Sequence, residues 1–177
     1  NVGSIFNSWD AVVSWNRWAI NWADEIIPMS ARNYPQLMPM HWSLTYVFMA
    51  NTGVQFFAKA LTLPFAFLTL LMLFDLGLQK GSAGFFAGIV ITYLLLKKFI
   101  GGYLVNGYVD GAMAFFAFVP VYTLSKATYL ENEKERNTML WLGFIFAGSA
   151  ALVKQPGVYI FLIYPFLAFL GVQKYFP

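Results

Sequence analysis

The sequence contains no cysteine, which excludes disulfides, thiolate metal sites and a cysteine nucleophile. Charged residues are also scarce. They make up 11% of the 177 residues, whereas a soluble globular domain usually carries about 25%. There is no arginine-rich run or basic stripe, so nucleic acid is not an expected partner. A Walker loop, a dinucleotide fingerprint, a nucleophile elbow and a zinc motif are all missing, which leaves a soluble nucleotide-handling enzyme without support.

The residues that are plentiful are apolar and aromatic: 59% of the chain is hydrophobic, and 20% is Phe, Trp or Tyr. A soluble chain of this size could not cover its surface with so few charges. Aromatic side chains gather at the two interfaces of a membrane. We therefore predict an all-α integral membrane protein, built of several transmembrane helices and a Trp-rich juxtamembrane loop.

Residues 1–57 differ from the rest of the chain, because they hold five of the six tryptophans and the only histidine, His41. Their first helix is indicated by apolar residues spaced i, i+3, i+4 and i+7, namely Trp15, Trp18, Ala19 and Trp22. Such a face suits a helix lying on the membrane surface. The Pro-rich stretch 34–39 interrupts it. Residues 41–57 fit either a second surface helix or a weak span.

Residues 58–177 are predicted to form a transmembrane helical bundle of about five spans. The predicted spans are Leu61–Leu78, Ala83–Leu96, Ala112–Leu130, Met139–Val153 and Gly157–Val172. Tight hairpins are expected at residues 79–82 and 155–157, and a charged loop at residues 131–138. Asp75 is a candidate partner of Lys80. If the spans alternate and 41–57 does not cross, residues 1–57, 97–110 and Lys154 lie on one side.

Two carboxylates on that side could carry chemistry. Asp10 precedes the Trp-striped helix, and Asp110 directly precedes a span. Asp10 suits an N-cap or an acid in the first turn, where the helix dipole favours negative charge, and Asp110 suits a cap. Alternatively, Asp10 is a general base that takes a proton from an acceptor hydroxyl. Asp110 would then orient a substrate or, with Asp10, bind Mg²⁺ or Mn²⁺.

Basic residues are the second candidate group. Lys97, Lys98 and Lys154 lie at the ends of predicted spans. Lysines at such positions commonly anchor a helix by extending to the interface. The functional alternative is that they pair with the phosphate of a lipid-linked substrate. His41, next to Trp42, is expected to be an interfacial residue rather than a ligand.

Five loose motifs follow one another along the chain: an early acid ahead of a W/R-x-A helix, an aromatic-Pro-Leu segment, a Pro-containing span, an acid before an aromatic helix, and a lysine-containing hairpin. They correspond to Asp10 with Trp15–Ala19, Tyr34–Pro39 followed by Trp42–Tyr46, Lys59–Phe65, Asp110–Phe116, and Gly148–Gly157. This order resembles the N-terminal catalytic half of polytopic GT-C glycosyltransferases, such as aminoarabinose transferases and protein O-mannosyltransferases.

The resemblance implies inverting transfer of a sugar from a polyprenyl-phosphate donor to an acceptor hydroxyl or lipid. Asp10 would be the base, and residues 1–57 the first extracytoplasmic loop of a plasma (inner) membrane protein rather than an ER protein. The implied substrate-binding residues are Asp110, Lys154, Arg17, Arg32, Tyr34, His41, Lys97 and Lys98. Relatives carry a lysine before the Pro-Leu segment; this sequence does not, and Arg32 is the nearest candidate.

Such relatives also have a span before the acid and several spans after the last one present here, so we expect this chain to be part of a larger protein. Two other functions fit the composition. One is a non-catalytic integral membrane subunit of a larger complex. The other is a transporter or channel, which would need polar groups near mid-membrane and repeated halves; the apolar spans count against it.

Overall fold

The computed structural model of the chain describes residues 5–95 and 107–175, and every regular element in these ranges is helical. The prediction of an all-helical fold is confirmed. The N-terminal unit, residues 5–60, contains the π-helix η1 (Ala11–Trp15), α1 (Asn16–Ala23), the 3₁₀-helix η2 (Met29–Ala31), α2 (Leu37–Met49) and α3 (Phe56–Ala60). The bundle contains α4 (Leu63–Lys80), α5 (Ala83–Leu95), α6 (Asp110–Ala127), α7 (Glu133–Val153) and α8 (Gly157–Tyr175).

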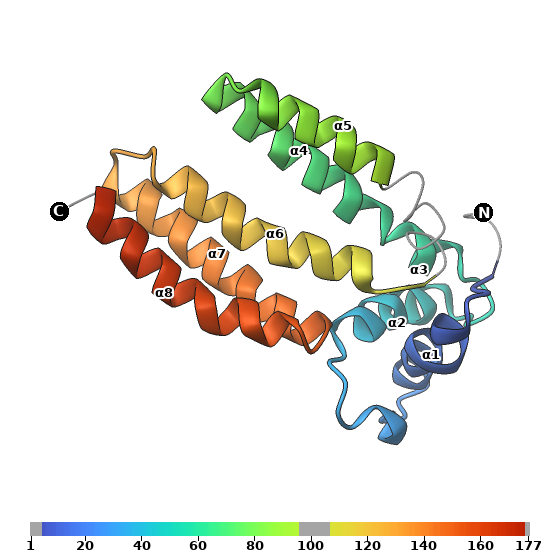
Figure 1. The fold of residues 1–177 in the computed structure, drawn as a ribbon. Helices are drawn as coiled ribbons and strands as arrows, with labels where there is room; N and C mark the ends of the chain where they lie inside the picture. The colour runs from blue at the N-terminus through green and yellow to red at the C-terminus, as the bar shows by residue number, and fades with distance from the viewer. Residues whose placement is uncertain (1–4, 96–106, 176–177) are drawn as a thin grey trace.

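The bundle consists of two layers of antiparallel helices (Figure 1). Helices α6, α7 and α8 pack in sequence, and the α4–α5 hairpin lies along α6. The N-terminal unit covers one end of the bundle, where α4, α6 and α8 begin and α7 ends. Each of the five predicted apolar segments is one of these helices. Gly81 ends α4 in the left-handed conformation, with φ of 56°, which glycine adopts without steric cost.

The predicted charged loop at residues 131–138 is wrong for most of its length, because α7 already begins at Glu133. The carbonyl oxygen of the Asn132 side chain accepts hydrogen bonds from the backbone N–H groups of Lys134, at 2.9 Å, and Glu135, at 3.3 Å. This is an N-cap. Glu133 and Glu135 lie in the first turn, where the helix dipole favours negative charge. The charges therefore start a helix rather than interrupt one.

The Asp75 carboxylate has partners both on its own helix and on a neighbouring one. On its own helix, Gln79 Nε2 donates to Oδ2 at 3.3 Å, while the side chain of Lys80, the partner suggested by the sequence, lies outside the described part. On the neighbouring helix, Asp75 Oδ2 accepts from Lys126 Nζ at 2.9 Å and from the Tyr122 hydroxyl at 2.8 Å. Both partners lie on α6, so this ion pair fastens α4 to α6 at the end far from the N-terminal unit. If the predicted spans alternate in direction, Asp75 and Lys126 lie at the same end of the bundle, but this alternation did not predict that their side chains touch.

Helices α6, α7 and α8 come close together at Gly143. A Cβ at this position would collide with the Tyr164 hydroxyl and with Thr123 Oγ1. The Tyr164 hydroxyl donates to the Leu140 carbonyl at 2.9 Å. A glycine in the middle of α7 therefore lets a tyrosine from α8 and a threonine from α6 meet its backbone.

Two segments are long and apolar enough to cross a membrane by length and composition. One is Phe56–Gln79, which joins α3 and α4 over 24 residues, and the other is α7, with 21 residues. Apolar stretches of α5 and α8, Ala83–Leu94 and Gly157–Gly171, are shorter. Large apolar side chains of the bundle point outward, including Phe67, Ile145 and Phe166. The outer surface of the bundle is therefore rich in exposed apolar side chains.

The N-terminal unit has a compact aromatic core. Helices α1 and α2 pack against each other, and Trp15, Trp18 and Trp42 are buried between them or against neighbouring segments. The Tyr46 hydroxyl of α2 donates to Asn16 Oδ1 of α1. Burial raises the pKa of Tyr46, so this hydroxyl keeps its proton and remains a donor.

Helix α2 spans 13 residues, about 20 Å, and does not join the bundle as a span.

The predicted lipid-facing tryptophan stripe is therefore wrong in its direction. The stripe faces the core of the N-terminal unit, and each of its three indole N–H groups donates to a side-chain oxygen of that unit. Trp15 donates to Asp10 at 2.8 Å, Trp18 to Ser30 at 3.2 Å and Trp22 to Gln36 at 3.1 Å. A tryptophan buried in protein usually finds such a partner. The spacing of the tryptophans correctly identified the apolar face of the helix, but it did not show that this face packs against protein.

Candidate functional site

Asp10 lies at the start of the π-helix η1, partly buried. Its backbone is already helical, and its side chain makes no capping hydrogen bond, so Asp10 is an acid in the first turn of the helix rather than an N-cap. Instead, Oδ2 of the carboxylate accepts the indole N–H of Trp15 at 2.8 Å. The neighbouring Trp9 is 79% exposed, which leaves this side of Asp10 near the surface.

The segment containing Tyr34 connects this acid to the bundle. Tyr34 packs edge-on against Trp15, with ring centroids 6.2 Å apart, and against Trp18 at 5.5 Å. The backbone carbonyl of the preceding residue, Asn33, accepts a hydrogen bond from Gln155 Nε2 at 2.9 Å. Gln155 belongs to the tight turn between α7 and α8, so this bond fastens the N-terminal unit to the bundle.

Asp110 and Lys154 form an ion pair beside that turn. Lys154 Nζ lies 2.7 Å from Asp110 Oδ1, and the two side chains are 30% and 55% exposed, respectively. Asp110 is the first residue of α6, and Lys154 follows the last residue of α7. An ion pair this exposed contributes about 0–1 kcal/mol in water, so it orients the two groups more than it stabilises the fold.

Gly107 brings the two acids to the same end of the molecule. A Cβ at Gly107 would lie 2.5 Å from the Cβ of Ala11 and 2.6 Å from the Phe6 ring. Gly107 also has φ of 90°, which a residue with a Cβ rarely adopts. The residue after Asp10 thus touches the loop three residues before Asp110. From Asp10, contacts run through Trp15, Tyr34, Asn33 and Gln155 to the Lys154–Asp110 pair.

The other predicted site residues are not all part of this arrangement. Arg32 is exposed, two residues before Tyr34, and Arg17 is exposed on α1. His41 is exposed on α2, where it lines an apolar groove of about 540 Å³ with residues of α2, α3 and Leu61. Lys97 and Lys98 lie outside the described residues.

The predicted Mg²⁺ or Mn²⁺ site at Asp10 and Asp110 stays a prediction. Within residues 5–95 and 107–175, no three His, Asp or Glu side chains are grouped as a ligand set. The donors that these two carboxylates do have are an indole N–H and an ammonium group.

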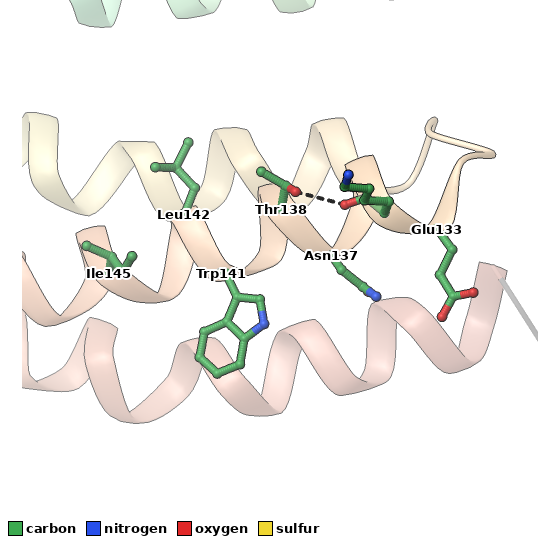
Figure 2. Close-up of a pocket in the computed structure, with 7 residues that line it drawn as sticks. Glu133, Asn137, Thr138, Trp141, Leu142 and Ile145 are labelled. Atoms are coloured by element: carbon green, nitrogen blue, oxygen red, sulfur yellow. Dashed lines mark hydrogen bonds between the residues drawn. The ribbon is translucent and has the colours of Figure 1, made fainter.

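A second surface feature lies away from this site. The outer face of α7 lines a shallow hollow of about 790 Å³, which Figure 2 shows as a polar end at Glu133 and Asn137 followed by Trp141 and Ile145. Thr138 Oγ1 donates to the Lys134 carbonyl at 2.8 Å. All lining residues belong to α7 and lie toward the opposite end of the bundle. The hollow is therefore separate from the site that contains Asp10, Asp110 and Lys154.

Sequence reasoning missed three residues of the site. Trp15 was assigned to lipid, although it is the hydrogen-bond donor to Asp10. Gln155 and Asn33 carry the contact between the N-terminal unit and the bundle. They are separated by 122 positions, and neither residue type is unusual in a turn. No periodic pattern could have paired them.

The sequence matches no protein-family model, and comparisons with curated proteins and with solved structures find no match. Function must therefore be argued from the residues and their geometry.

Proposed function

We propose that this chain is the catalytic segment of a polytopic membrane glycosyltransferase that uses a polyprenyl-phosphate sugar donor. In this proposal the bundle helices cross the membrane, and the N-terminal unit lies at its extracytoplasmic surface. The outward apolar side chains of the bundle and the two long apolar helices support membrane insertion. The chain's resemblance to GT-C transferases supports the choice of reaction.

The observation that carries the proposal is the contact path from Asp10 to the Lys154–Asp110 pair. It gathers a partly buried carboxylate, an exposed acid and a lysine at one end of the bundle, together with the Tyr34 segment, in which Arg32 is exposed. An anionic lipid head needs cationic partners at the interface, and an acceptor hydroxyl needs a base. Lys154 and Arg32 supply the former, and Asp10 supplies the latter.

The reaction then proceeds by displacement at the anomeric carbon. The acceptor hydroxyl gives its proton to Asp10, and its oxygen forms the new bond to the anomeric carbon as that proton leaves. The bond between the anomeric carbon and the phosphate oxygen breaks, and polyprenyl phosphate departs with the electron pair. Attack from the face opposite the phosphate inverts the anomeric centre.

The decisive experiment replaces Asp10 by Asn in the chain reconstituted in lipid nanodiscs. Sugar transfer from a panel of polyprenyl-phosphate hexoses and pentoses is then followed as release of polyprenyl phosphate. General-base catalysis typically contributes about 10²- to 10⁴-fold, so Asp10→Asn should lose at least 100-fold in turnover. Asp24→Asn, which changes an exposed acid at the end of α1, is the matched control and should retain activity. Wild-type turnover in Asp10→Asn would overturn the assignment.

A non-catalytic membrane subunit is the second candidate, and one observation favours it. Asp10 and Asp110 each have an internal partner, Trp15 and Lys154, as residues with a purely structural role would. On this alternative, both Asp10→Asn and Lys154→Gln would reduce stability slightly, and wild-type protein would transfer no sugar from any donor of the panel.

A further inference from the structure

We propose that Trp15 is the positioning residue for Asp10. Its indole N–H holds Oδ2 of the carboxylate and so directs Oδ1 toward the acceptor hydroxyl. This inference rests on the proposed function, because it assigns a role to Trp15 through the base. It follows from the winding of the helix at Asp10, from the packing of the indole, and from the difference between the two carboxylate oxygens.

The winding of η1 is what brings the two side chains together. In an α-helix, a residue five positions on lies about 140° around the axis, on a different face. In η1 the backbone N–H of Asn16 instead bonds to the carbonyl of Ala11, five residues back. This wider turn places Trp15 over Asp10, with Nε1 and Oδ2 2.8 Å apart. Single π-turns of this kind often occur at functional sites.

The indole ring is fixed on its other sides. Trp15 is 2% exposed, and its ring packs edge-on against Trp18, with centroids 5.0 Å apart, and against Tyr34 at 6.2 Å. Turning the ring would break both contacts and leave a buried donor without an acceptor. Packing therefore sets the orientation of the indole, and the indole in turn restrains the orientation of the Asp10 carboxylate.

The two carboxylate oxygens become different as a result. Oδ2 is occupied by Trp15, and within the described ranges no second side chain donates to Asp10. Oδ1 keeps its lone pairs and can accept a proton. A base held in one orientation needs no rotation before transfer, and misplacement by about 1 Å can cost roughly 100-fold in rate.

The hydrogen bond is tested first, without any activity. Protein labelled with ¹⁵N-tryptophan in detergent micelles gives indole N–H resonances from six tryptophans, and Trp15→Phe identifies the Trp15 resonance by its loss. Asp10→Asn should shift that resonance more than any other. Trp22→Phe is the matched control, because Trp22 also donates an indole N–H, to Gln36 Oε1 at 3.1 Å, but not to Asp10.

Positioning is tested by kinetics with the polyprenyl-phosphate sugar that the wild-type protein transfers. Trp15→Phe should lower kcat by roughly 10- to 100-fold with KM unchanged, whereas Trp22→Phe should change both by less than twofold. Retention of the other five indole resonances shows that Trp15→Phe is folded.

Each failure has its own signature. An unmoved Trp15 resonance in Asp10→Asn means that the hydrogen bond does not exist and overturns the inference. A shifted resonance, an inactive Asp10→Asn and a Trp15→Phe as fast as Trp22→Phe overturn the positioning role while the base assignment stands. Full activity in Asp10→Asn overturns the proposed function, and the positioning role with it.

Discussion

The N-terminal unit and the bundle differ in where they place their apolar side chains. The N-terminal unit turns its aromatic side chains inward and satisfies the indole N–H groups of its tryptophan stripe with oxygens of its own loops. The bundle turns apolar side chains outward, and only 22% of the residues in the apolar window of α7 are buried. Both parts are rich in apolar residues, so composition alone does not distinguish them.

This difference fits the proposed function, in which the N-terminal unit lies at the membrane surface and the bundle crosses the membrane. An aromatic core whose stripe of indole donors is paired suits a domain in contact with water. Outward apolar faces with little interior burial are what helices in lipid need. Predictions that sharpen this contrast change one part at a time and follow each part by its own signal. Five of the six tryptophans lie in residues 1–57, so indole fluorescence reports mainly on the N-terminal unit, whereas helical circular dichroism reports mainly on the bundle.

The largest effect is expected from Trp42→Ala. Trp42 is fully buried and stacks on Phe6 with ring centroids 5.0 Å apart. Truncating a buried tryptophan typically costs about 3–5 kcal/mol. Denaturant unfolding followed by indole fluorescence should show the N-terminal unit unfolding well before the helical signal of the bundle is lost.

Two controls accompany this variant. Trp42→Phe keeps a ring on Phe6 and removes an indole N–H that pairs with no group in the part of the chain that the structure describes, so it should cost much less. Leu44→Ala changes an apolar residue of α2 that is 64% exposed and should cost little. Simultaneous loss of both signals in Trp42→Ala would mean that the two parts unfold as one unit.

An intermediate effect is expected from Gly143→Ala in the bundle. The added methyl group would collide with Tyr164 and Thr123, which belong to the two neighbouring helices. Overpacking of this kind costs about 1–3 kcal/mol, and the loss should appear in thermal unfolding followed by circular dichroism, with indole fluorescence largely unchanged.

Gly148→Ala is the matched control on the same helix. Its Cβ would lie 3.7 Å from the Phe161 ring, an ordinary contact, and alanine favours helix over glycine by about 1 kcal/mol. Gly148→Ala should therefore equal or exceed the wild-type stability. If both variants behaved alike, the close approach of α6, α7 and α8 at Gly143 would be wrong.

The smallest effect comes from the two ion pairs. Lys154→Met removes the exposed partner of Asp110 and should change the free energy of unfolding by no more than about 1 kcal/mol. Lys126→Met leaves Asp75 without its cation at a position that the proposal assigns to the membrane-spanning bundle. Because an unpaired carboxylate costs more in lipid than in water, the Lys126 variant should be the less stable of the two. Thermal unfolding in nanodiscs measures the difference, and equal stability would place both pairs in water.

Much of the fold could be predicted from the sequence. The long apolar runs predicted helices, and all five predicted segments of the bundle are helical. The π-turn at residues 11–15 and the early start of α7 at Glu133 were not predicted. Both depend on local hydrogen bonds, of Asn16 with Ala11 and of Asn132 with the first turn of α7. Hydrophobic periodicity does not report such bonds.

By itself, the sequence determined where the five apolar helices of the bundle lie, which face of the first helix is apolar, and that the chain divides near residue 60. Periodicity and composition are local properties, and they are sufficient for these features. Only the tertiary structure decided what each face meets. It turned the tryptophan stripe toward protein, gave Asp10 an indole partner, paired Asp75 with Lys126 on another helix and joined Gln155 to Asn33. A pattern specifies a face, but the neighbour of that face is chosen by helix docking, which brings together residues that no spacing in the sequence relates.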